Sequence, residues 1–100
     1  MKVRSVVVFH PRPGKEGQLL DAIKTVKKII ERNGGTLMVT RQVIGPQPGD
    51  VVAVAQYDDW NGFGKVRSDS ELQQLLERMR NNPDPPADVV ASAAYEEIEL

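Results

Sequence analysis

The chain has 100 residues, and its 13 Lys and Arg nearly balance its 14 Asp and Glu. That length fits a single domain spanning residues 1–100, and the balanced charge offers no field for nucleic acid or an anionic membrane surface, so neither is an expected partner. The absence of cysteine excludes disulfides, thiolate catalysis and cysteine-ligated metal centres, and a single histidine predicts no metal site and no cofactor.

The first predicted elements are a strand from Lys2 to His10 and a helix from Lys15 to Asn33. The strand's apolar run, Val6 to Phe9, is too short for a signal peptide or a membrane span, so a cytoplasmic location is expected. The helix is predicted by an apolar stripe with a period of 3.6 residues, formed by Leu19, Ile23, Val26 and Ile30. Gly34 and Gly35 suit its C-terminal end, because glycine accepts the left-handed conformation.

A hairpin follows, with strands predicted from Thr36 to Ile44 and from Val51 to Tyr57 around a Gly- and Pro-rich turn. If Ile44 lies opposite Val51, one sheet face is small and partly polar, and it carries Thr40, Gln42, Ala53, Ala55 and Tyr57. The other face is then bulky, and it carries Leu37, Val39, Arg41, Val43, Val52 and Val54. The small face suits either a pocket that includes Gln42 or close packing of a helix on the alanines.

The remaining elements are an irregular or short helical segment from Trp60 to Arg67, a helix from Ser68 to Asn81 and a strand from Val89 to Leu100. Ser68 and Glu71 have the spacing of a capping box, which predicts the start of that helix. The order β-α-β-β-α-β predicts an α+β, ferredoxin-like fold, with a four-stranded antiparallel sheet and two helices on one face. Right-handed crossovers are expected to place the first and third strands in the centre, and these two are taken to be parallel neighbours.

Both central strands are nearly continuous in apolar residues, whereas two helices cover only one sheet face. A second copy of the chain is the expected cover for the other face, so the sequence predicts a homodimer. Four segments carry a resemblance that agrees with this prediction: Val6 to Phe9, Pro13-Gly14-Lys15, Asn33-Gly34-Gly35 and Tyr57-Asp58-Asp59-Trp60.

Through these segments the chain resembles the dimeric α+β barrel proteins, which include the antibiotic-biosynthesis-monooxygenase-like and NIPSNAP-like domains. The resemblance implies two sheets packed face to face across a twofold axis, with a pocket between each sheet and its own helices. It implies a choice among cofactorless oxygenases, haem-degrading enzymes, isomerases, cyclases and proteins without known activity. Haem degradation is not expected, because Ser68 to Asn81 lacks the histidine that such members carry on their second helix.

The predicted site lies where the two central strands end. If they are parallel, His10 lies beside Tyr57 and Asp58, and an imidazole next to a carboxylate suits general acid–base catalysis. Trp60 and Phe63 would join Tyr57 and Gln42 as substrate-binding residues at the same rim. An alternative stays open for each role: His10 could be a surface residue without catalytic function, and Trp60 and Phe63 could close the end of the core rather than bind a ligand. The expected function is binding of a small apolar organic molecule, either by a cofactor-independent oxygenase, isomerase or cyclase or by a non-catalytic module.

Overall fold

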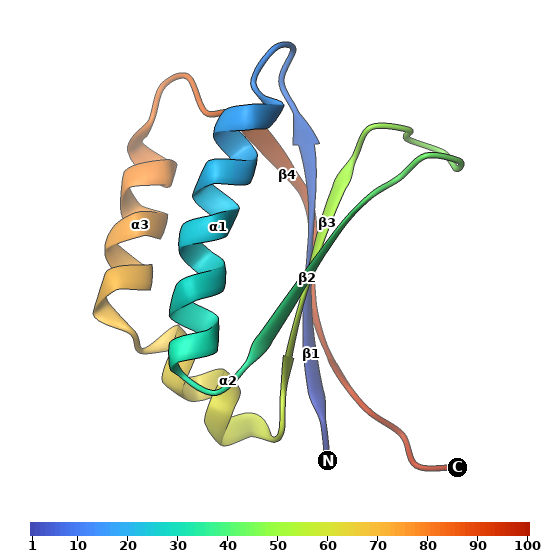
Figure 1. Ribbon diagram of the computed structural model, residues 1–100, viewed down its shortest axis with the longest axis vertical. Helices are drawn as coiled ribbons and strands as arrows, with labels where there is room; N and C mark the ends of the chain where they lie inside the picture. The colour runs from blue at the N-terminus through green and yellow to red at the C-terminus, as the bar shows by residue number, and fades with distance from the viewer.

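The computed structural model describes residues 1–100 and orders its elements as β-α-β-β-α-α-β (Figure 1). The elements are β1 (Val3–Pro11), α1 (Glu16–Arg32), β2 (Thr36–Arg41), β3 (Val51–Tyr57), α2 (Trp60–Arg67), α3 (Ser70–Asn81) and β4 (Ala87–Glu96). The ferredoxin-like class is confirmed, with the segment that begins at Trp60 forming a helix of its own. None of the helices has the length and hydrophobicity that crossing a membrane requires.

The sheet has the order β2-β3-β1-β4, and every neighbouring pair is antiparallel. Val3 lies opposite Tyr57 and Phe9 lies opposite Val51, so the prediction that β1 and β3 are parallel was wrong. The physical reason lies in the connections. The crossover through α1 makes β2 run in the same direction as β1, and the following hairpin reverses the chain, so β3 must run against β1.

The hairpin register also differs from the prediction. Arg41, rather than Ile44, lies opposite Val51, because β2 ends at Arg41 and residues 42–50 form a wide loop. Pro46 and Pro48 lack the N–H groups that a longer ladder needs. A shift by three residues is odd, so it exchanges the two faces of β2.

Leu37 and Val39 therefore share the helix-covered face with Ala53 and Ala55, whereas Gln42 lies beyond the strand. Both alternatives weighed for the alanines apply in part: Ala55 packs in the core under the helices, and Ala53 and Ala55 also line a cavity there. Arg41 turns to the same side and pairs with Glu16 at the start of α1.

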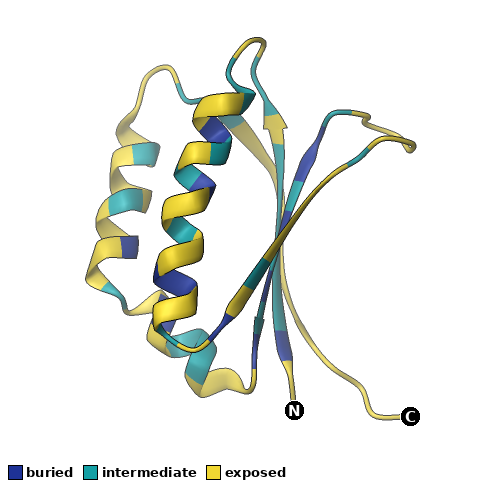
Figure 2. Ribbon diagram, in the orientation of Figure 1, coloured by how far each residue is buried: buried dark blue, intermediate teal, exposed yellow.

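The core lies between the sheet and the helices, which all cover the same sheet face (Figures 1 and 2). Its buried side chains come mainly from α1 and from every second residue of β3: Leu19, Ile23, Ile29, Ile30, Val51, Ala53, Ala55 and Tyr57. Burying one such aliphatic side chain stabilises the fold by roughly 1.5–3 kcal/mol. The predicted amphipathic stripe of the first helix is thus confirmed by the packing of Leu19, Ile23 and Ile30.

No element covers the other sheet face, which we call the open face (Figure 1). Its central side chains are Val6, Val8, Val52 and Val54, which pair across β1 and β3 and are only partly buried. Met38 of β2 lies in the same row as Val54 and is 61% exposed. An isolated chain therefore leaves an apolar sheet surface in water.

Hydrogen bonds at the helix ends define where α1 stops and where α3 begins. Gly34 has a φ of 88°, and the N–H groups of Gly34 and Gly35 donate to the carbonyls of Glu31 and Ile30, which is a Schellman end for α1. The predicted capping box at Ser68 is displaced by one residue, because the Asp69 carboxylate accepts the N–H groups of Glu71 and Leu72 instead. Both interactions satisfy backbone groups that a helix end leaves without partners.

Candidate functional site

A cavity of about 330 Å³ lies between the inner sheet face and the helices. Seventeen of its twenty lining residues are hydrophobic, and they come from β1, β2, β3, α1, α2, α3 and β4. Four lining residues are exposed: Arg67 on α2, Leu76 on α3, and Val89 and Ser92 on β4. The cavity therefore opens between α3 and β4, and it has the size and apolar lining of a small-molecule site.

Two of the predicted ligand-binding residues, Tyr57 and Phe63, line this cavity. Their rings meet edge to face with centroids 5.8 Å apart, and Phe63 contacts the Trp60 ring in the same manner at 5.3 Å. Trp60 lies outside the lining, is 48% exposed and donates its indole N–H to Glu96. Phe63 thus combines the two roles weighed from the sequence: it closes the end of the core and forms part of the cavity wall.

Tyr57 is the buried polar group of the cavity. Its side chain is 5% exposed, and its hydroxyl makes no hydrogen bond within the protein, although the oxygen is not sealed off from open space. Burial raises the pKa of the Tyr57 hydroxyl, opposed by the positive charge of Arg67, so the group stays protonated at neutral pH. It is available to donate to an oxygen of a bound molecule.

The position of Tyr57 depends on Gly35. A Cβ at residue 35 would come within 2.9 Å of the Tyr57 ring and 2.8 Å of Ile30. The predicted role of Gly35 as a helix terminator is therefore only part of its function, since the missing side chain also leaves room for the ring. Sequence reasoning missed this contact, because no local pattern links residues 35 and 57.

His10 lies at the opposite end of β1 from Tyr57. Seven residues separate His10 from Val3, the partner of Tyr57, which corresponds to roughly 23 Å of strand. The predicted proximity of His10 to Tyr57 and Asp58 was therefore wrong, and the cause is the antiparallel direction of β3. Asp58 is exposed and forms no hydrogen bond or ion pair.

The carboxylate that does meet His10 is Asp50. The Nδ1 atom of His10 lies 2.6 Å from Oδ1 of Asp50, and Asp50 is only 4% exposed. On the other side of β1, His10 faces Asp88, which accepts a hydrogen bond from Arg12 at 3.0 Å. That bond lowers the pKa of the Asp88 carboxyl. An antiparallel register would have revealed the His10–Asp50 pair, because the ladder places residue 50 opposite residue 10.

Gln42 serves the hairpin loop and lies outside the cavity lining. Its side-chain oxygen accepts the N–H of Gln47 at 2.6 Å, and its backbone bonds to Gly49 and Asp50. These contacts order the loop that carries Asp50. Gln42 therefore supports the His10–Asp50 pair indirectly, at the end of the sheet opposite Tyr57.

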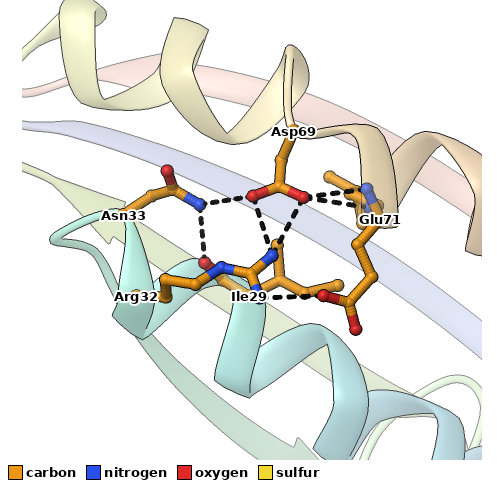
Figure 3. Close-up of polar contacts among 6 residues, drawn as sticks. Ile29, Arg32, Asn33, Asp69 and Glu71 are labelled. Atoms are coloured by element: carbon orange, nitrogen blue, oxygen red, sulfur yellow. Dashed lines mark hydrogen bonds and ion pairs between the residues drawn. The ribbon is translucent and has the colours of Figure 1, made fainter.

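A polar network ties the end of α1 to the start of α3 (Figure 3). The Asp69 carboxylate accepts hydrogen bonds from Asn33 and Arg32, and Arg32 also donates to Glu71 at 2.8 Å. The bonds from Asn33 and Arg32 lower the pKa of Asp69 to about 2. The network joins the end of α1 to the start of α3, next to the cavity-lining residues Ile30, Val66 and Leu72.

Comparison with known proteins rests on structure. No protein-family model matches the chain, and no curated protein sequence matches it. Solved structures match along nearly its whole length, among them Rv0793 from Mycobacterium tuberculosis, with a TM-score of 0.74 and 13% identity over 100% of this chain and 98% of that one. SnoaB from Streptomyces nogalater, a cofactor-independent oxygenase, matches with a TM-score of 0.76 and 12% identity over 99% and 95%.

A third match, with a TM-score of 0.76 and 15% identity, covers 98% of this chain and 94% of a candidate antibiotic biosynthesis monooxygenase from Deinococcus radiodurans. The chain has the fold of the antibiotic-biosynthesis-monooxygenase-like proteins. The resemblance noted in the sequence is thus confirmed at the level of fold. Identities of 12–15% among these three matches show a shared architecture and leave the chemistry to the residues of the site.

Proposed function

We propose that the chain binds a small, mostly apolar organic molecule in the cavity between its sheet and its helices. The observation that carries this proposal is Tyr57, a buried residue that lines a mostly apolar cavity of about 330 Å³ and whose hydroxyl has no hydrogen-bond partner within the protein. A ligand oxygen that accepts a hydrogen bond from this hydroxyl would contribute a net stabilisation of roughly 0.5–1.5 kcal/mol. Apolar walls supply affinity, and the Tyr57 hydroxyl helps to fix the orientation of the ligand.

Oxygenation of the bound molecule without a cofactor is the second candidate. It is supported by the fold shared with SnoaB, which is a cofactor-independent oxygenase, and by a protonated Tyr57 that would hold an oxygen of the substrate. A role for His10 in acid–base chemistry stays a prediction. Because His10 and Asp58 do not line the cavity, any such role would involve the His10–Asp50 pair and a molecule held elsewhere.

Ligand binding is tested by calorimetric titration with a neutral bicyclic aromatic, 2-naphthamide. Ala22 lies on the α1 face that lines the cavity, so Ala22→Phe places a ring in the space the ligand would occupy. Thr25 is exposed on the same helix, and Thr25→Phe is the matched control. We expect one-to-one binding by the native chain and the control, and none by Ala22→Phe. Equal binding by both variants would place the probe elsewhere and contradict the proposal.

We also propose that the chain forms a homodimer through the open face. The four strands have 9, 6, 7 and 10 residues, which gives the sheet a footprint of roughly 500 Å², less than the roughly 800 Å² that each partner buries in a standard interface. The loop between β2 and β3 lies on the same side of the sheet (Figure 1) and carries Val43 and Ile44, which are 77% and 93% exposed. These side chains would add the missing area by packing on the second copy.

A further inference from the structure

We infer that Arg67 makes the cavity selective for an apolar molecule that carries an anionic oxygen, such as an aromatic carboxylate. This inference rests on the proposed ligand binding and specifies the class of ligand. Arg67 is the one charged residue among those that line the cavity. The chemistry of the lining thus combines a large apolar surface with a single fixed positive charge.

The guanidinium group of Arg67 has no anionic partner in the protein. Four other arginines, Arg4, Arg12, Arg32 and Arg41, form ion pairs with Asp or Glu side chains, whereas Arg67 forms none. Its only specific side-chain contact is with the face of Phe63, with Cζ 5.3 Å from the ring centroid. This stacking orients the group and leaves its N–H donors unoccupied.

Arg67 and Tyr57 act on the same end of the cavity. The Tyr57 ring and the Arg67 guanidinium both contact the Phe63 ring. The positive charge of Arg67 also acts to lower the pKa of the Tyr57 hydroxyl, against the effect of burial. One oxygen-bearing group could therefore receive a hydrogen bond from Tyr57 and a charge-assisted bond from Arg67. A carboxylate fits this pair well, since its oxygens accept bonds from a guanidinium fork. The apolar body of the ligand would lie along the sheet and α1.

A simpler role for Arg67 exists, because a cation in the last turn of a helix interacts favourably with the helix dipole. Lys65 occupies the same last turn of α2, but it does not line the cavity. Helix stabilisation accounts for a positive charge at either residue, whereas it does not account for the position of Arg67 on the cavity wall. Lys65 is therefore the matched control for Arg67.

The test compares two probes of the same shape, 2-naphthoate and its neutral amide, 2-naphthamide, by calorimetric titration at pH 7.5. The native chain is expected to bind 2-naphthoate about tenfold or more tightly than 2-naphthamide, as a charge-assisted hydrogen bond predicts. Arg67→Gln should abolish this preference while leaving the affinity for 2-naphthamide within about twofold. Lys65→Gln should keep the preference. Thermal melting of each variant confirms that it is folded.

The outcomes separate this inference from the proposed function. If the native chain binds both probes equally, or if Arg67→Gln and Lys65→Gln lose the preference equally, the selectivity assigned to Arg67 is wrong and ligand binding still stands. If neither probe binds, the proposed function fails and the inference fails with it.

Discussion

His10 pairs with Asp50 at the end of β1, and not with Asp58 as expected from the sequence. Asp50 is 4% exposed, and His10 is its only side-chain partner. His10→Ala leaves the carboxylate buried without that partner, which we expect to lower the free energy of unfolding by about 1–3 kcal/mol. His10→Gln keeps an amide donor and should have a smaller effect. Urea unfolding measures both variants, and a fully stable His10→Ala chain would show that water replaces the imidazole.

At the scale of elements, Asp69 connects three helices. It caps α3, bonds to Asn33 and Arg32 at the end of α1, and follows α2 by two residues. Asp69→Ala removes the cap and the network, and we expect the melting temperature to fall by roughly 5 °C or more, as the loss of a helix cap does in a domain of this size. Asp58→Ala is the control, because that carboxylate makes no contact. Equal melting temperatures for the two variants would contradict the structural role of the network.

The same residue predicts a pH dependence. The pKa of Asp69 is about 2 in the folded chain, below its ordinary value of 3.8, so folding favours the ionised form. Its stabilising contribution is complete above pH 3.8 and is lost as the pH falls toward 2. Asp69→Asn can still cap the helix but cannot ionise. Its melting temperature should therefore fall less steeply than that of the native chain between pH 4 and pH 2.

For the whole molecule, the decisive feature is the open face. Val54 lies on this face and Ala55, its neighbour in β3, lies under the helices. If the open face is the dimer interface, Val54→Asp buries an unpaired charge between two copies and should give a folded monomer. Ala55→Asp places the same charge in the core and should unfold the chain. Sedimentation and circular dichroism distinguish these results, and a native chain that sediments as a stable monomer would refute the proposed dimer.

Local patterns in the sequence predicted the type and order of the main elements and the ferredoxin-like class. The apolar stripe on α1, the glycines after it and the continuous apolar run of β3 are local patterns, and each describes how a short segment meets water or core. Apolar surface in excess of what the helices cover was also predictable, from the apolar runs of the two central strands and the small number of helices. Such properties depend on residues close together in the chain, which is why they could be predicted.

The tertiary structure decided which distant residues meet. An alternating strand pattern is compatible with several registers, and the width of the loop from Gln42 to Asp50 selected the one that turns Leu37 and Val39 toward the helices. Strand direction placed His10 beside Asp50, roughly 23 Å of strand from the level of Tyr57. The position of Arg67 on the cavity wall depends on how α2 packs against β3. These contacts join segments far apart in sequence, and only the folded chain as a whole fixes their geometry.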